Sequence, residues 1–192
     1  DTDRGRAPRL PGAGMMCAVV LGWSMFMGKR SFRPLVAVVI VMAVNAAANI
    51  VPLNGYNTGT LSAMYPTGFT PAGRTFSIWS LIYLGLLAFG ITAWVGAPRI
   101  RERISAIAGP FYLNALGNVA WIFVWHWQFV EASFVVMVGM LATLVVIFRR
   151  LRELPAPTRG EFFVVDGVFS LYFGWISAAT LLNLGNLCFD LK

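Results

Sequence analysis

The stretch that decides the fold is ISAIAGPFYLNALGNVAWIFVWHWQFV, residues 104–130, which contains no Asp, Glu, Lys or Arg. A helix needs about 20 predominantly apolar residues to cross the hydrocarbon layer of a bilayer. Because backbone groups cannot stay unpaired in lipid, such a run must be helical rather than an open strand. It also lacks the strict apolar and polar alternation of a barrel strand. The stretch therefore predicts a membrane-spanning helix.

Four further runs without these charged residues are long enough to cross a bilayer. The complete set is residues 35–53, 75–97, 104–130, 132–148 and 167–189. The whole chain of 192 residues is 58% hydrophobic and only 12% charged, with a mean hydropathy of +0.71, whereas soluble domains carry about 25% charged residues. This composition excludes a disordered chain and disfavours an ordinary soluble enzyme. We predict an all-α, polytopic membrane protein, a bundle of five transmembrane helices.

The basic residues support the same count independently. If the chain crosses the membrane five times, 13 of its 15 Lys and Arg residues fall on one side. Arg74 and Lys192 fall on the other side. Since basic residues are enriched in cytoplasmic segments, the N-terminus is predicted in the cytoplasm and the C-terminus outside, in an organelle membrane if the protein is eukaryotic. The net charge of +7 is thereby attributed to orientation, and no nucleic acid is expected as a partner.

Two regions differ from the predicted helices in composition. Residues 1–33 are a basic, Pro/Gly-rich N-terminal extension with a short apolar run, either a targeting segment or upstream sequence outside the core. Residues 34–192 form the predicted membrane domain. Within it, residues 54–73 carry Asn-Gly, Tyr-Pro and Thr-Pro dipeptides, which favour turns. This connection is either a binding loop or a plain surface connector.

Polar and aromatic side chains recur at helical spacing inside the predicted spans. They are Asn45 and Asn49, Trp79 and Tyr83, then Asn114, Asn118, Trp121 and Trp125, and finally Tyr172, Trp175, Ala179, Asn183 and Asn186. An amide facing lipid would lack hydrogen-bond partners, so these stripes are predicted to point inward. The run 132–148 is mostly Val, Leu, Met and Ala, which favours a lipid-facing helix.

Two interpretations of these stripes remain open. The amides can join helices while tryptophans near helix ends, Trp94, Trp125 and Trp127, form interfacial belts. Alternatively, the inward aromatic and amide side chains line a cavity for a flat apolar ligand, since ligand pockets are mostly apolar with a few placed polar groups. Periodicity alone favours the packing interpretation.

Three motifs in order carry a family resemblance. Residues 65–83 (YPTGFTPAGRTFSIWSLIY), 118–121 (NVAW) and 175–183 (WISAATLLN) resemble the TspO/MBR family. These are tryptophan-rich sensory proteins related to the translocator protein or peripheral benzodiazepine receptor. The resemblance extends from about residue 35 to about residue 186 and covers all five spans. The sequences of residues 52–55 (PLNG) and 76–79 (FSIW) resemble those of a longer branch of that family.

The resemblance implies a five-helix bundle whose cavity opens beneath the loop between the first two helices. It also implies porphyrin-like tetrapyrroles or other apolar small molecules as ligands, with no obligatory cofactor, and a homodimer or larger membrane complex besides the lipid bilayer. Carried over by motif, the ligand-binding residues would be Phe76, Trp79, Tyr83, Asn118, Trp121, Trp175 and Ala179. The expected function is that of a membrane-embedded sensor, receptor or transporter. The alternative is an accessory subunit that uses the fold for packing alone.

Other chemistry is sparse in the sequence. His126 could ligate a haem axially or be a structural histidine. Asp166 is expected either to reach the membrane interface or to pair with an arginine of the segment that precedes the fifth helix. Neither a Gly-x-Ser-x-Gly elbow, a phosphate loop nor a His-Glu-x-x-His motif is present. We therefore assign no catalytic residue and no metal ligand, and the sequence does not indicate an enzyme. A channel is disfavoured because the intramembrane polar groups are neutral amides.

Overall fold

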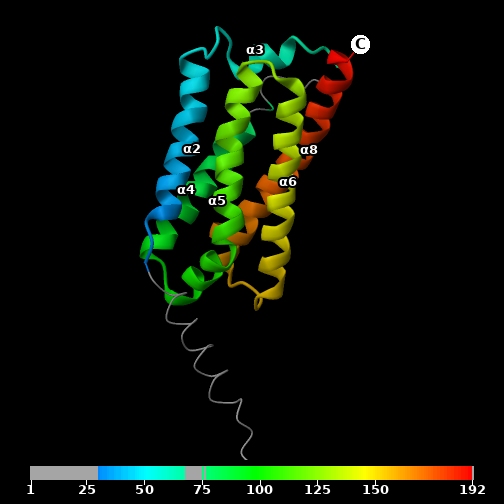
Figure 1. The fold of residues 1–192 in the computed structure, drawn as a ribbon. Helices are drawn as coiled ribbons and strands as arrows, with labels where there is room; N and C mark the ends of the chain where they lie inside the picture. The colour runs from blue at the N-terminus through cyan, green and yellow to red at the C-terminus, as the bar shows by residue number, and fades with distance from the viewer. Residues whose placement is uncertain (1–29, 68–74, 76, 192) are drawn as a thin grey trace, which may run out of the picture.

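The chain forms a bundle of five long helices that run side by side (Figure 1). The structure, a computed structural model, describes residues 30–67, 75 and 77–191. The long helices are α2 (Arg33–Ile50), α4 (Ile78–Val95), α5 (Pro98–His126), α6 (Val130–Glu153) and α8 (Gly167–Asp190). All five are long and apolar enough to cross a membrane, and the described residues form no strand. The predicted fold class is confirmed, whereas most of the predicted N-terminal extension lies outside the described residues.

The helix ends depart from the predicted runs where charged residues occur. α5 already begins at Pro98 rather than at residue 104, and α6 continues to Glu153 beyond residue 148. Ahead of α8, helical structure begins with the short α7 (Arg159–Glu161) and the π-helical turn η2 (Phe162–Asp166). A charged residue ends the hydrocarbon crossing, but it does not end a helix, because arginine and glutamate are good helix formers.

A short helix, α3 (Thr58–Ala63), lies across one end of the bundle (Figure 1). Its start is fixed by a capping box: the backbone N–H of Thr60 donates to Asn57 Oδ1 (2.9 Å), and the backbone N–H of Asn57 donates to Thr60 Oγ1 (3.1 Å). Before it, Asn54 and Gly55 adopt the left-handed backbone conformation of a tight turn, with φ of 52° and 83°. The predicted turn at this Asn-Gly pair is confirmed, whereas α3 was not predicted.

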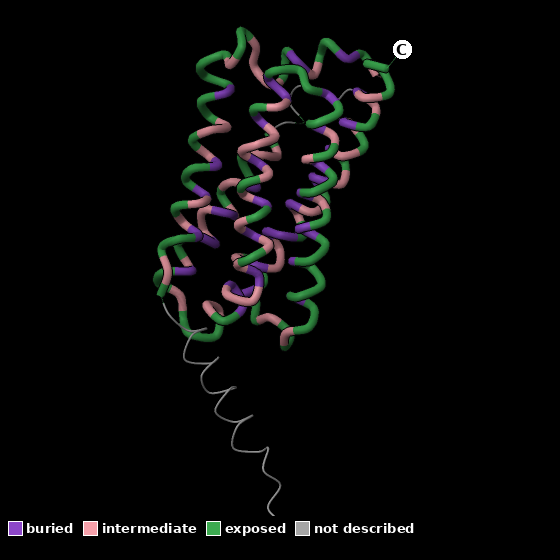
Figure 2. The backbone as a smooth tube through the Cα atoms, viewed as in Figure 1, coloured by how far each residue is buried: buried purple, intermediate pink, exposed green. Residues whose placement is uncertain are grey.

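The core occupies the space between α4, α5, α6 and α8 (Figure 2). The inward stripes predicted on the third and fifth spans are confirmed, since their members are buried apart from the half-buried Trp121. α6 also buries a full face, with Met137 and Ile147 among its core residues, so the prediction of a lipid-facing helix is wrong for that face. α2 approaches α4 closely at Gly90, where a Cβ atom would stand 2.8 Å from the Cα of Leu35.

The three tryptophans considered for an interfacial belt divide into two groups. Trp94 and Trp127 are 51% and 47% exposed near helix ends, as a belt residue should be. Trp125 is only 3% exposed and stacks on Trp121 with ring centroids 5.8 Å apart. The belt interpretation therefore does not hold for Trp125, which is a core residue.

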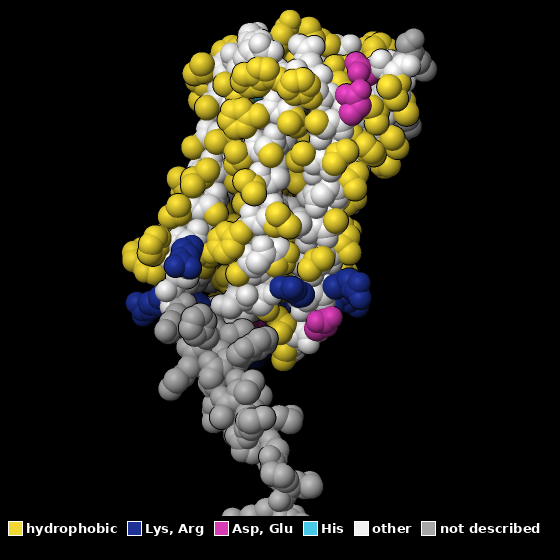
Figure 3. All heavy atoms as spheres, in the orientation of Figure 1, with side chains coloured by type: hydrophobic (Ala, Val, Ile, Leu, Met, Phe, Trp, Pro, Cys, Tyr) yellow, Lys and Arg dark blue, Asp and Glu magenta, His cyan; other side chains and the backbone are white. Residues whose placement is uncertain are grey.

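Every Lys and Arg that the structure describes lies at one end of the bundle, opposite α3 (Figure 3). We call it the arginine end, and its members are Arg30, Arg33, Arg99, Arg101, Arg103, Arg149, Arg150, Arg152 and Arg159. The described acids of the α3 end are Glu131 and Asp190. The clustering matches the charge pattern that five crossings require.

A buried ion pair joins α5 to η2 at the arginine end. The guanidinium of Arg103 on α5 donates to both carboxylate oxygens of Asp166, at 2.8 and 2.6 Å, and to the carbonyls of Leu151 and Pro155. The two charged side chains are 6% and 16% exposed. Asp166 is thus paired with an arginine, but this is Arg103 of α5 rather than an arginine of the segment before α7, which was one of the two expectations. The reason is that Arg103 reaches inward from the first turns of α5, where its guanidinium bonds both to Leu151 at the end of α6 and to Asp166 of η2.

Candidate ligand cavity

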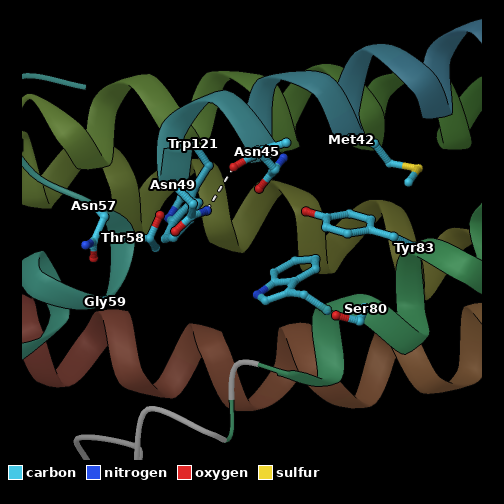
Figure 4. Close-up of a pocket in the computed structure, with 11 residues that line it drawn as sticks. Met42, Asn45, Asn49, Asn57, Thr58, Gly59, Ser80, Tyr83 and Trp121 are labelled. Carbon is cyan, nitrogen blue, oxygen red and sulfur yellow. Dashed lines mark hydrogen bonds between the residues drawn. The ribbon is translucent and has the colours of Figure 1, made fainter. Parts of the chain in front are cut away.

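A cavity of about 550 Å³ lies between α2, α3, α4 and α5, toward the α3 end of the bundle. Its described lining residues are Met42, Asn45, Ala46, Asn49, Asn57, Thr58, Gly59, Trp79, Ser80, Tyr83 and Trp121. Figure 4 shows Asn45 of α2 on the side of the Tyr83 hydroxyl, and Asn49 beside Thr58 and Trp121. None of these lining residues carries a charge, so the described wall combines aromatic surface with neutral polar groups.

Aromatic rings form much of the wall contributed by α4. Trp79 and Tyr83, one turn apart, stack with ring centroids 5.2 Å apart and an interplanar angle of 23°. Behind them, Tyr172 and Trp175 of α8 meet the Trp79 ring edge-on, at 6.0 and 6.1 Å. These contacts hold the Trp79 ring in place and leave it as a preformed apolar surface on the cavity.

A hydrogen-bond relay leads from the cavity into the core. Asn45 Nδ2 donates to Asn118 Oδ1 (2.8 Å), and Asn118 Nδ2 donates to the Tyr172 hydroxyl (3.1 Å). Trp121 Nε1 makes a longer contact of 3.4 Å to Asn183 Oδ1, which also accepts from the Ser133 hydroxyl. Buried amides in lipid need such partners, so the relay fixes α2, α5 and α8 relative to one another.

Two hydroxyl groups in the lining residues have no hydrogen-bond partner. The Tyr83 hydroxyl and Thr58 Oγ1 are both buried, and no atom of the structure lies within hydrogen-bonding range in suitable geometry. Leaving a buried polar group unsatisfied costs about 1–3 kcal/mol. The lining residues therefore include two buried hydroxyls whose hydrogen-bonding capacity is unused.

At the α3 end of the cavity, the segment from Asn54 to Tyr65 packs against α5. Asn54 Nδ2 donates to the carbonyl of His126 (3.0 Å), and Leu61 of α3 is fully buried with Tyr65 against Trp125. The Tyr65 and Trp125 rings lie 5.7 Å apart. The pKa of the Tyr65 phenol is raised by burial and, to a smaller extent, by the negative charge of Asp190. The segment that covers the cavity therefore packs on the bundle as part of the fold.

The sequence profile of the TSPO-like protein family matches residues 32–190, which span all five long helices. The chain belongs to the TSPO-like family. No curated protein and no solved structure matches it significantly. Together with the five apolar helices, this membership makes the chain an integral, multi-pass membrane protein of that family.

The structure places the ligand-binding residues predicted for this TSPO-like protein at three depths. Trp79, Tyr83 and Trp121 line the cavity directly. Asn118 lies one contact behind the wall, through its bond with Asn45, and Trp175 lies behind Trp79. Ala179 is buried in the core and is not among the described lining residues. Phe76 lies outside the described residues.

Most lining residues that the motifs did not assign to the site come from α2 and from α3 with its N-cap Asn57, and Ser80 of α4 is a further one. Met42 and Ala46 belong to an apolar run in which nothing distinguishes a cavity-facing residue from a lipid-facing one. The sequence predicts inward faces for Asn45 and Asn49 but does not assign them to the site. Asn45 is half-buried, whereas Asn49 is exposed, so the inward prediction is wrong for Asn49 although it lines the cavity. Thr58 and Gly59 belong to α3, which the turn-rich sequence concealed.

His126 and the acidic residues do not form a metal site in the part of the chain that is described. His126 is 0% exposed, and its Nδ1 lies 2.7 Å from the carbonyl of Ile122, one turn earlier on α5. Among the described residues no cluster of His, Cys, Asp and Glu could hold a metal ion. This placement supports the structural interpretation of His126 over axial haem ligation.

Proposed function

We propose that this protein binds a flat, largely apolar small molecule of the porphyrin-like class in the cavity between α2, α3, α4 and α5. The ligand-binding wall would comprise the Trp79 and Tyr83 rings, Trp121, and the amides of α2. The observation that carries the proposal is the cavity itself, whose volume of about 550 Å³ lies within the usual range for ligand sites. Aromatic surface with a few neutral polar groups is the lining that such a ligand requires.

The unpartnered hydroxyls of Tyr83 and Thr58 support binding over a role in packing alone. A fold used only as a scaffold gains stability when neighbouring side chains fill its interior and its buried polar groups are paired. Here a cavity persists, and buried hydroxyls in its lining residues lack partners. As an integral membrane protein, the chain would then act as a sensor or transporter of its ligand.

A porphyrin titration tests this proposal. Protoporphyrin IX is added to the purified protein in detergent micelles, and its Soret absorbance is followed against empty micelles. We expect saturable binding that weakens in Trp79→Leu, because aromatic stacking contributes about 0.5–1.5 kcal/mol beyond burial. Trp94→Leu is the matched control, since Trp94 lies on the same helix but is exposed at its other end. Equal affinities in the parent and both variants, or no saturable binding, would contradict the proposal.

We further propose that the arginine end faces the cytoplasm, which places the N-terminus inside and the C-terminus outside. The cavity would then open toward the outer side of the membrane. Single cysteines at Glu102 and Met64, both exposed and at opposite ends of the bundle, are introduced after Cys17 and Cys188 are replaced by alanine. An impermeant maleimide applied from outside should label position 64 alone; labelling of position 102 alone would reverse the orientation.

A further inference from the structure

The side-chain amide of Asn45 has a fixed orientation. Its Nδ2 lies 2.9 Å from the backbone carbonyl of Val41 and 2.8 Å from Asn118 Oδ1. Because a backbone carbonyl can only accept, the atom facing Val41 must be the nitrogen. Asn118 must then turn its oxygen toward Asn45 and its nitrogen toward the Tyr172 hydroxyl, as observed at 3.1 Å. The relay therefore has one consistent hydrogen-bond direction.

This direction leaves Asn45 as a pure acceptor toward the cavity. Both hydrogens of its amide are used, by Val41 and by Asn118, whereas no described residue donates to its Oδ1. Asn49 Nδ2 donates to the backbone carbonyl of Asn45 at 2.8 Å, so the Oδ1 of Asn49 is also without a described donor. Figure 4 shows the two amides beside each other on the α2 side of the cavity, with Asn45 nearer to Tyr83.

Among the described residues, no positive charge lies at this wall. The described lining residues are uncharged, and the described cation of α2 is Arg33 at its first turn. Asn45 is 12 positions after Arg33, which corresponds to about 18 Å along a helix. A carboxylate placed against the two carbonyl oxygens would lose its hydration without gaining a donor or a counter-charge from α2.

From these observations we propose that Asn45 is a specificity-determining residue that selects ligands presenting an N–H or O–H donor to the α2 wall, rather than a carboxylate or a bare acceptor. This rests on the proposed function of the cavity as a ligand site. The favoured class is a flat apolar ring system with a donor at its edge. Val41 acts as a positioning group, because its backbone carbonyl accepts from the Asn45 nitrogen and so turns the Asn45 oxygen toward the ligand.

Carbazole and dibenzofuran test this proposal, because these tricyclic molecules have nearly the same shape. Carbazole carries an N–H donor where dibenzofuran carries an acceptor oxygen. Binding is measured by isothermal titration calorimetry on the purified full chain in detergent micelles, with empty micelles as the blank. One hydrogen bond and one relieved repulsion predict that the parent binds carbazole about three- to tenfold more tightly than dibenzofuran.

Two leucine variants separate selection from stability. Asn45→Leu and Asn118→Leu both remove the bond between these residues, but only Asn45→Leu removes the acceptor oxygen. The carbazole preference is therefore expected to fall to about onefold in Asn45→Leu and to persist in Asn118→Leu, even if both bind more weakly overall. Asn45→Ala carries the same expectation as Asn45→Leu without added bulk, should the leucine variant fail to fold.

The outcomes distinguish this proposal from the proposed function. Equal binding of carbazole and dibenzofuran by the parent, or a preference that survives in Asn45→Ala, overturns the selection by Asn45 while leaving ligand binding in place. Failure of both tricyclic molecules in a protein that binds protoporphyrin IX also overturns it. Absence of binding by the tricyclic molecules and by protoporphyrin IX removes the proposed function, and this inference with it.

Discussion

Replacing Arg103 with methionine tests whether one buried ion pair holds the arginine end together. The substitution removes two hydrogen bonds to Asp166 and those to the carbonyls of Leu151 and Pro155. Breaking a buried pair costs about 3–5 kcal/mol, because the partner charge stays behind without compensation. The Asp166 side chain is still 16% exposed, so water can partly solvate its charge. We therefore expect a loss in the lower part of that range, about 3 kcal/mol.

The free energy of unfolding is measured by titration with sodium dodecyl sulfate in mixed micelles, followed by far-ultraviolet circular dichroism. Arg149→Met is the matched control: Arg149 is exposed at the same end, and its loss should change stability by less than about 0.5 kcal/mol. The double variant Arg103→Met/Asp166→Leu should recover most of the loss, because no unpaired charge remains. A loss in Arg103→Met no larger than that in the control would refute the reasoning, as would a double variant less stable than Arg103→Met.

Two further substitutions test the contacts that shape the cavity and the bundle. Asn118→Leu removes the bonds to Asn45 and Tyr172, and at about 0.6 kcal/mol for each interhelical bond the unfolding free energy should fall by about 1 kcal/mol; an unchanged value in the same titration would show that the relay does not stabilise the fold. Gly90→Ala should be destabilising, since its Cβ atom would meet the α2 backbone at 2.8 Å, whereas Gly139→Ala, with nothing within 4 Å, should be neutral or slightly stabilising. Equal effects of the two alanine substitutions would contradict the close approach of α2 and α4.

The five crossings could be predicted because lipid imposes a simple rule on length, apolarity and charge. Residues 104–130 meet that rule, and α5 does cross the bundle there. The ends of α5 and α6 could not be predicted in the same way, because the arginines that mark the end of the hydrocarbon layer remain within helices. The charge pattern therefore located the membrane boundary rather than the helix boundary.

The pairing of Arg103 with Asp166 was outside the reach of the sequence pattern. The two residues are 63 positions apart, and the local pattern offered Asp166 nearer arginines in the segment before α7. Which arginine reaches it depends on how α5, α6 and η2 converge. That arrangement follows from packing and has no counterpart in local periodicity.

The cavity could be predicted only on its aromatic side. Tryptophan, tyrosine and asparagine at helical spacing indicated inward faces on α4, α5 and α8, and Trp79, Tyr83 and Trp121 do line the cavity. Ala46 gave no such signal, because the sequence cannot distinguish an alanine that faces a cavity from one that faces lipid. Trp175 belonged to an inward stripe as well, but Trp79 stands between it and the cavity wall.

The most direct test of a ligand site in this cavity compares two alanines that are neighbours on α2. Ala46 and Ala47 are both exposed, but only Ala46 is among the described lining residues, because successive residues of a helix point about 100° apart. The dissociation constant of protoporphyrin IX is measured for the parent, Ala46→Phe and Ala47→Phe in the same micelles. A ring filling the cavity should weaken binding by about tenfold or more in Ala46→Phe, with the affinity of Ala47→Phe unchanged. Equal affinities in the two phenylalanine variants would contradict ligand binding in this cavity.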